Sequence, residues 1–151
     1  MKVSNEIINI CPEIKKWRHE LHAHPELGYE EEWTSNFVAE KLESFGLEIH
    51  RGMAKTGVVG VLKGANASLG GGGNKAIGLR ADMDALPMTE ENDFSYKSKF
   101  DGRMHACGHD GHTAMLLGAA KLLSSKKDFD GTVYFIFQPA EEGGGGGLAM
   151  I

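Results

Sequence analysis

Residues 109–137 read HDGHTAMLLGAAKLLSSKKDFDGTVYFIF and place a helical pattern directly before an apolar strand. Between His109 and Leu123 the apolar residues recur at helical spacing, which predicts an amphipathic helix. Thr132–Phe137 is almost entirely apolar, as is typical of a strand that is buried on both faces of a sheet. The stretch therefore predicts an α/β domain in which this strand lies near the centre of the sheet.

The residues before this unit also alternate between helical and extended patterns. Helical spacing predicts one helix over Asn5–Ala23 and another over Glu30–Phe45, with Gly46 as the C-terminal cap of the second. Three apolar runs of strand length follow, at Leu47–His50, Val58–Leu62 and Ala76–Leu79. We expect a three-layer α/β fold, in which a mostly parallel or mixed sheet carries helices on both faces.

Two glycine-rich stretches interrupt this pattern. GANASLGGGGN at residues 64–74 predicts a surface loop. The alternative, a phosphate-binding loop, lacks the Lys-Ser/Thr ending that such loops carry. The second stretch, residues 143–147, leads into LAMI, which resembles the start of a helix.

Composition narrows the class of protein. The 151 residues carry a formal net charge of −5, with no basic cluster longer than a pair, which excludes nucleic acid and anionic membranes as expected partners. No apolar run approaches the ~18 residues of a membrane span, and the N-terminal residues lack the apolar core of a signal peptide. We expect a cytoplasmic protein whose two cysteines, Cys11 and Cys107, are reduced.

The strongest chemical signal is MHACGHDGHTAM at residues 104–115. Cys107 and His109 stand two apart, so in an extended segment their side chains point the same way. Thiolate and imidazole are ligand types that Zn²⁺ and similar ions prefer. His112 shares a face with His109 if the helix has already begun there. A helix N-terminus with buried, hydrogen-bonded histidines is the alternative, but the density of ligand-type residues favours a metal site.

A second signal is the pair Glu141-Glu142, which follows the central strand at the edge where α/β proteins place their sites. The side chains of adjacent residues diverge, so one carboxylate can bind a metal while the other acts as a general base. Two solvated acids before a flexible loop are the alternative interpretation.

Two further segments carry weaker signals. In LRADMDALP, Asp82 or Asp84 can orient a ligating imidazole, although a turn-forming aspartate before proline is as plausible. In WRHELHAHPELGYEE, at residues 17–31, His22 and His24 are either metal ligands or caps of the helix C-terminus. We favour capping, because histidines near that end interact well with the helix dipole.

The chain resembles the aminoacylase/hippurate hydrolase/carboxypeptidase metallopeptidase family, in its N-acyl amino acid amidohydrolase branch. The resemblance covers almost the whole chain. It rests on four segments, which occur in the order WRHELHAHPELGYEE, GLRADMDALP, MHACGHDGHTAMLLGAAKLL and QPAEEGGGG. It implies that the fold is part of a metallopeptidase catalytic domain.

The resemblance also implies roles for single residues. Cys107, His109 and Glu142 match metal ligands, Glu141 matches the general base, and Asp84 matches the aspartate of the active-site motif and would be catalytic. A complete site would hold two divalent ions, for which Zn²⁺, Mn²⁺, Co²⁺ and Ni²⁺ are the candidates. A water molecule held by these ions would lose its proton to Glu141 and cleave the amide bond of an N-acyl amino acid, hippurate-like or N-acetylated.

One position departs from many relatives, in which a ligating histidine stands where this chain has Asp82. As in the nearest branch, the segment from Cys107 to His109 is expected to take over that ligand role.

Family members are much longer than 151 residues. We expect residues 1–151 to be the N-terminal part of the metal-binding catalytic domain, without the rest of that domain and without the lid domain through which the full-length protein would form a homodimer. The chain alone would then be inactive. The alternative is a non-catalytic metal-binding or interaction domain derived from this family. Metal analysis with an N-acyl amino acid assay separates the two.

Overall fold

The computed structural model describes residues 3–65 and 75–151, and most of the predicted glycine-rich loop, residues 66–74, lies outside them. Each predicted helix and strand is present, with bounds that differ by a few residues from those expected. The elements are α1 (Asn5–His22), α2 (Glu32–Ser44), β1 (Glu48–Met53), β2 (Gly57–Lys63), β3 (Ala76–Asp82), α3 (His109–Lys126), β4 (Thr132–Gln138) and the short α4 (Gly146–Ala149).

The four strands form one mixed sheet in the order β1-β2-β4-β3. β4 lies inside the sheet, as its apolar sequence predicted, pairing antiparallel with β2 and parallel with β3. Its parallel register sets Asp82 opposite Gln138, so β3 and β4 end at the same edge of the sheet. The loops that carry the predicted site residues leave from that edge.

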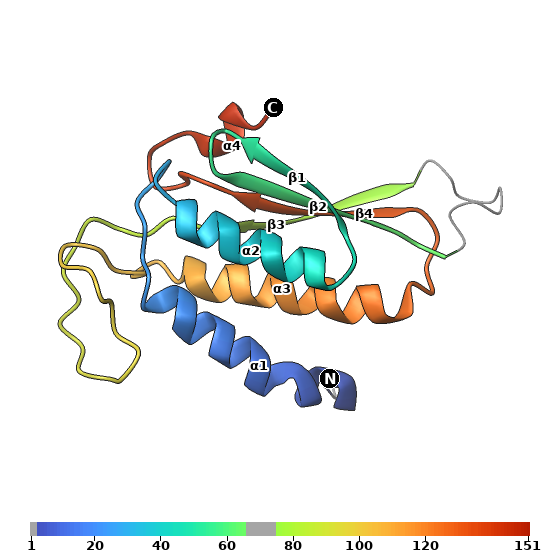
Figure 1. The fold of residues 1–151 in the computed structure, drawn as a ribbon, viewed down its shortest axis with the longest axis horizontal. Helices are drawn as coiled ribbons and strands as arrows, with labels where there is room; N and C mark the ends of the chain where they lie inside the picture. Colours follow the sequence, from blue (N-terminus) through green and yellow to red (C-terminus); the bar gives the residue numbers. More distant parts are fainter. Residues whose placement is uncertain (1–2, 66–74) are drawn as a thin grey trace.

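The three long helices lie together on one side of the sheet (Figure 1). α2 and α3 lie next to the strands, and α1 packs on α3 on the side away from the sheet. The expected α/β class, with a mixed sheet and helices, is confirmed. Among the described residues the long helices all lie on one side of the sheet, and the other side carries the short α4. The reason is that α3 connects two neighbouring parallel strands, which determines its side of the sheet, and α1 and α2 bury their apolar faces against the same cluster.

The hydrophobic core occupies the space between the sheet and these helices. Phe135 and Phe137 of β4 are completely buried there, together with Leu117 of α3 and Leu21 of α1. α1 and α3 approach closely at Gly118, where a Cβ atom would lie 2.4 Å from Cδ1 of Ile14. Within the described residues, no helix is both long and apolar enough to cross a bilayer.

Candidate metal centre

His109 is the first residue of α3 and the centre of the candidate site. Its Nδ1 lies 2.9 Å from the backbone oxygen of Asp84 and 3.2 Å from Oδ1 of the same residue. Because a carbonyl oxygen only accepts hydrogen bonds, Nδ1 carries the hydrogen and donates it. The lone pair of the neutral ring is then on Nε2, the atom that would bind a metal ion.

Nε2 of His109 faces a group of carboxylates. It lies 3.6 Å from Oδ1 of Asp82, 3.8 Å from Oε1 of Glu142 and 3.9 Å from Oε2 of Glu141. The His109 side chain is 5% exposed, whereas that of Glu141 is 43% exposed. The imidazole therefore belongs to the protein interior, and the carboxylate of Glu141 reaches toward solvent.

The predicted ligand residues converge. Cys107, His109 and Glu142 each offer one ligand atom, and these atoms all lie within 4.8 Å of one another. Asp82, His109 and His112 form a second group that meets the same limit. The ring centroids of His109 and His112 are 5.6 Å apart, because the helix has begun at His109 and the two residues share a face, as predicted.

The electrostatics of the site favour a cation. The pKa of the Cys107 thiol is raised by its hydrogen bond to Glu142 and by the charges of the nearby carboxylates. Burial lowers the pKa of His109, but its bond to Asp84 and the charge of Asp82 raise it, and the net shift is upward. Thiol, imidazole and carboxylate donors in a negative environment suit a borderline-soft divalent ion, so these residues fit a metal site.

Asp84 connects the two segments that carry the candidate ligands. Its side chain is 1% exposed, and while Oδ1 faces His109, Oδ2 accepts a hydrogen bond of 2.8 Å from the backbone N–H of Glu142. Burial raises the pKa of Asp84, but the bonds from His109 and from backbone N–H groups lower it, and the net direction is downward. An ionised aspartate thus ties α3 to the turn after β4.

Asp82 lies at the edge of the site and is held by a neighbour that sequence reasoning missed. Arg80 donates to Oδ2 of Asp82 over 2.8 Å and to the side-chain oxygen of Gln138 on β4 over 2.7 Å. Oδ1 of Asp82 lies 2.7 Å from Nδ1 of His112. Arg80 and Asp82 stand two apart on β3, and this strand spacing is the signal that could have paired them.

The histidines of the N-terminal segment have other roles. His24 Nδ1 donates to the carbonyl oxygen of Glu20 over 2.9 Å, which confirms the predicted cap at the C-terminus of α1. The same capping role predicted for His22 is wrong, because both of its ring nitrogens face buried carboxylates, 2.8 Å from Asp110 Oδ2 and 3.0 Å from Glu90 Oε1. Neither histidine belongs to the candidate ligand groups, and the sequence had not indicated this buried network.

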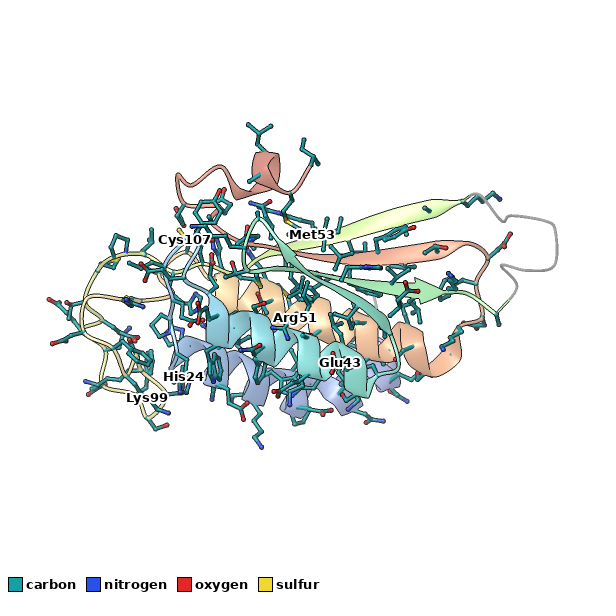
Figure 2. The ribbon with its side chains drawn as sticks, turned by 45° about the horizontal axis from the view of Figure 1, so that its top comes forward. His24, Glu43, Arg51, Met53, Lys99 and Cys107 are labelled. Carbon is teal, nitrogen blue, oxygen red and sulfur yellow. The ribbon has the colours of Figure 1, made fainter. Side chains whose placement is uncertain are left out.

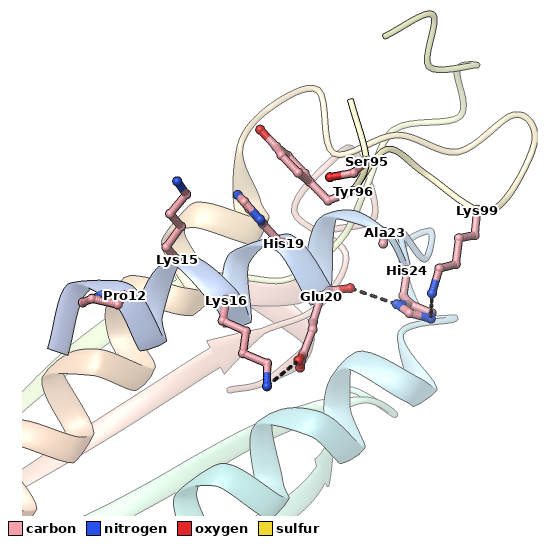
Figure 3. A pocket seen from close by; sticks show the side chains of 10 residues that line it. All are labelled: Pro12, Lys15, Lys16, His19, Glu20, Ala23, His24, Ser95, Tyr96 and Lys99. Carbon is pink, nitrogen blue, oxygen red and sulfur yellow. Dashed lines mark hydrogen bonds and ion pairs between the residues drawn. The ribbon is translucent and has the colours of Figure 1, made fainter. Parts of the chain in front are cut away.

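A hollow of about 470 Å³ lies between α1 and the segment around Tyr96 (Figure 3). Its walls include Lys15, Lys16 and Lys99, and the ring of His19 stacks on Tyr96 with 3.6 Å between centroids. Protonated lysines do not bind metal ions. Figure 2 shows Cys107 apart from Lys99, so this pocket is separate from the candidate metal centre.

A comparison with known families agrees with this arrangement of residues. The model of peptidase family M20/M25/M40 matches residues 78–151, the range that holds the candidate ligands. The chain belongs to this peptidase family. The family predicted from the four sequence segments is therefore confirmed.

Relatives of this peptidase family match the chain over nearly its whole length. It is 52% identical to a hippurate hydrolase of Campylobacter jejuni subsp. jejuni, over 100% of this chain and 38% of that protein. It is 50% identical to an N-acyl-L-amino acid amidohydrolase of Geobacillus stearothermophilus, over 91% of this chain and 37% of that protein. The chain thus spans less than two fifths of the length of these relatives.

Solved structures of peptidase-family relatives share the fold. A Bacillus subtilis protein, described as a dinuclear metal-binding peptidase of the M20 family, has a TM-score of 0.81 at 42% identity, covering 89% of this chain and 36% of that one. A protein from methicillin-resistant Staphylococcus aureus has a TM-score of 0.87 at 38% identity, covering 95% of this chain and 37% of that one.

Proposed function

We propose that the protein to which this chain belongs hydrolyses the amide bond of N-acyl amino acids with the help of divalent metal ions. The observation that carries the proposal is the convergence of Cys107, His109 and Glu142 within 4.8 Å, with Glu141 beside them. The names of the relatives, a hippurate hydrolase and an N-acyl-L-amino acid amidohydrolase, support hippurate-like or N-acetylated substrates.

Within this proposal, the ligand atoms are Sγ of Cys107, Nε2 of His109 and a carboxylate oxygen of Glu142. A complete site would hold two ions of Zn²⁺, Mn²⁺, Co²⁺ or Ni²⁺, in keeping with the dinuclear description of the Bacillus subtilis neighbour. When bound, such ions polarise the substrate carbonyl and make a water molecule easier to deprotonate. Asp84 acts through His109 and Glu142, which it positions, because its two oxygens are already engaged with them.

Glu141 is the proposed general base. Its side chain is 43% exposed, and its Oε2 lies 3.9 Å from Nε2 of His109, beyond hydrogen-bonding distance, so the carboxylate can accept a proton from water. It can take a proton from the attacking water and return it to the departing amine nitrogen, which are the two proton transfers that amide hydrolysis needs.

The test is the variant Glu141→Gln in the intact protein, assayed with hippurate and with N-acetyl amino acids. Loss of the base should reduce kcat by about 10²–10⁴-fold, while the metal content stays unchanged. Glu91→Gln, at an exposed acid, is the matched control and should retain full activity. Undiminished turnover by Glu141→Gln would exclude it as the base.

A wild-type protein that binds metal tightly but hydrolyses none of these substrates would support the alternative of a non-catalytic metal-binding domain. The proposal also includes a cytoplasmic location, in which Cys11 and Cys107, both free thiols, stay reduced. It further includes the assignment of these residues to the N-terminal part of a catalytic domain, in a protein that dimerises through a lid domain.

A further inference from the structure

The turn after β4, which carries Glu141 and Glu142, has an unusual backbone. Ala140 has a φ of 50°, and Gly143 and Gly145 have φ values of 82° and 65°. Glycine adopts such angles freely, but an alanine there is strained. A strained residue persists only when its surroundings hold it in place. The groups that hold Ala140 therefore determine where the two following glutamates point.

Glu31 holds the start of this turn. Its side chain is fully buried, and its Oε1 accepts a hydrogen bond of 2.8 Å from the backbone N–H of Ala140. Its Oε2 accepts a hydrogen bond of 2.6 Å from Oγ1 of Thr56. Burying a carboxylate is costly unless it is hydrogen-bonded, and here both oxygens are. The proposed reaction assigns no chemical step to the carboxylate of Glu31.

Tyr29 holds the other end of the turn. Its hydroxyl donates a hydrogen bond of 2.7 Å to the backbone oxygen of Gly144. Tyr29 itself has a φ of 65°, so a strained residue also stands on the short segment that carries Glu31. Beside it, a Cβ atom on Gly28 would lie 3.0 Å from Cβ of Ala140, so the two backbones are in close contact. Residues 28–31 thus hold the turn at Ala140 and at Gly144, and we call these two hydrogen bonds the clasp.

A third contact comes from the opposite direction, since Asp84 accepts the backbone N–H of Glu142. Glu141 and Glu142 lie between these anchors. We infer that Tyr29 and Glu31 are positioning residues, which hold the turn so that one glutamate faces the ligand cluster as a metal ligand and the other stands beside it as the base. This inference rests on the proposed function for what the glutamates do, but the clasp itself is independent of that function.

A merely structural role for Glu31 and Tyr29 would affect the stability of the whole domain and leave the turn no more mobile than its surroundings. A positioning role makes a local prediction. Removing one anchor should free the amides of residues 140–144, weaken metal binding through Glu142 and lower kcat more than it raises KM. A conservative replacement that keeps the hydrogen bond should restore all three properties.

The variants Glu31→Ala, Glu31→Gln and Tyr29→Phe separate these cases. Glutamine keeps an oxygen for the N–H of Ala140, and its amide group can donate to Oγ1 of Thr56, so Glu31→Gln should behave like wild type. Glu31→Ala should raise hydrogen exchange of the amides at 140–142 about tenfold or more, since it leaves a buried N–H without a partner. Tyr29→Phe should do the same more weakly near Gly144. Glu32→Gln and Tyr134→Phe, at exposed positions, are the matched controls.

Hydrogen exchange and Co²⁺ binding, followed by the absorption of the bound ion, are measured beside the hydrolysis of hippurate. We expect Glu31→Ala to bind Co²⁺ about tenfold more weakly, with Glu31→Gln restored. If Glu31→Ala does not fold, Tyr29→Phe alone decides the question. Turn amides that exchange at the wild-type rate in Tyr29→Phe and Glu31→Ala, or a Glu31→Gln variant as impaired as Glu31→Ala, would overturn the inference. A wild-type protein without turnover would refute the proposed function but leave the exchange result valid.

Discussion

Replacing Asp84 by asparagine tests whether this residue holds the two halves of the candidate centre together. Asp84 faces Nδ1 of His109 with one carboxylate oxygen and accepts the backbone N–H of Glu142 with the other. Asparagine has the same shape but offers only one acceptor oxygen, because its second group is an NH₂ donor. In Asp84→Asn, one of the two N–H partners must therefore face another donor.

The cost follows from the burial of the site. Asp84 is 1% exposed, so a lost hydrogen bond is not replaced by water. A hydrogen bond to a charged group contributes about 1.5–3 kcal/mol, and a buried donor without a partner costs about 1–3 kcal/mol. We expect Asp84→Asn to lower the free energy of unfolding by about 2–4 kcal/mol at neutral pH. His109 keeps its bond of 2.9 Å to the backbone oxygen of residue 84 but loses the charged side-chain partner at 3.2 Å, so metal binding should weaken about tenfold, at the low end of the usual 10–100-fold range.

Urea unfolding and a competition titration with a chromophoric chelator measure the two effects, and Asp93→Asn, at an exposed position, is the control. The pKa of Asp84 is lowered in the folded protein, so its stabilising effect is present above the unfolded pKa of about 4 and is lost as the pH falls through the folded value. The difference between wild type and variant should therefore shrink in acid. An Asp84→Asn protein with wild-type stability and metal affinity would refute this account.

Three further predictions concern other parts of the chain. Cys107→Ser should weaken Zn²⁺ binding about tenfold or more and Mn²⁺ binding less, because manganese prefers oxygen ligands; equal losses in a metal competition assay would contradict a thiolate ligand. Hydrogen bonds to Asp110 and Glu90 raise the pKa of His22, although its burial lowers it. The contribution of His22 to the free energy of unfolding is therefore complete below about pH 6.5 and is lost as the pH rises through the folded pKa. His22→Asn should therefore lose about 3–5 kcal/mol of unfolding free energy near pH 6 and less at alkaline pH, and a pH-independent loss would argue against the ion pairs. Gly146→Ala would set a Cβ atom 1.8 Å from the backbone oxygen of Pro139. This clash should lower the free energy of unfolding by about 1–3 kcal/mol and with it the thermal midpoint. An unchanged midpoint would show that the turn can move to accept the side chain.

Much of the candidate site was predictable because it depends on short stretches. Cys107 and His109 are two residues apart, and Glu141 and Glu142 are adjacent and follow a strand that its apolar composition identifies. The segment from Cys107 to His109 is not extended as expected, because Gly108 has a φ of 83° and His109 begins α3. The residue types and their closeness in sequence predicted this pair, and the strand spacing did not. The histidines of the N-terminal segment show the limit of such reasoning. His22 and His24 are both histidines and stand two residues apart in the sequence. Yet His22 lies between buried carboxylates, whereas His24 caps the C-terminus of α1.

Periodicity and local ligand spacing were sufficient to predict the helices, the strands, the internal position of β4 and the residues offered to a metal ion, since each depends on neighbours within a few positions. The pairing of β3 with β4, the gathering of three helices on one side of the sheet and the clasp of Glu31 on Ala140 could not be predicted in this way. Glu31 and Ala140 are 109 residues apart. Such a contact exists only after chain packing has brought distant segments together, and no local pattern records which segments those will be.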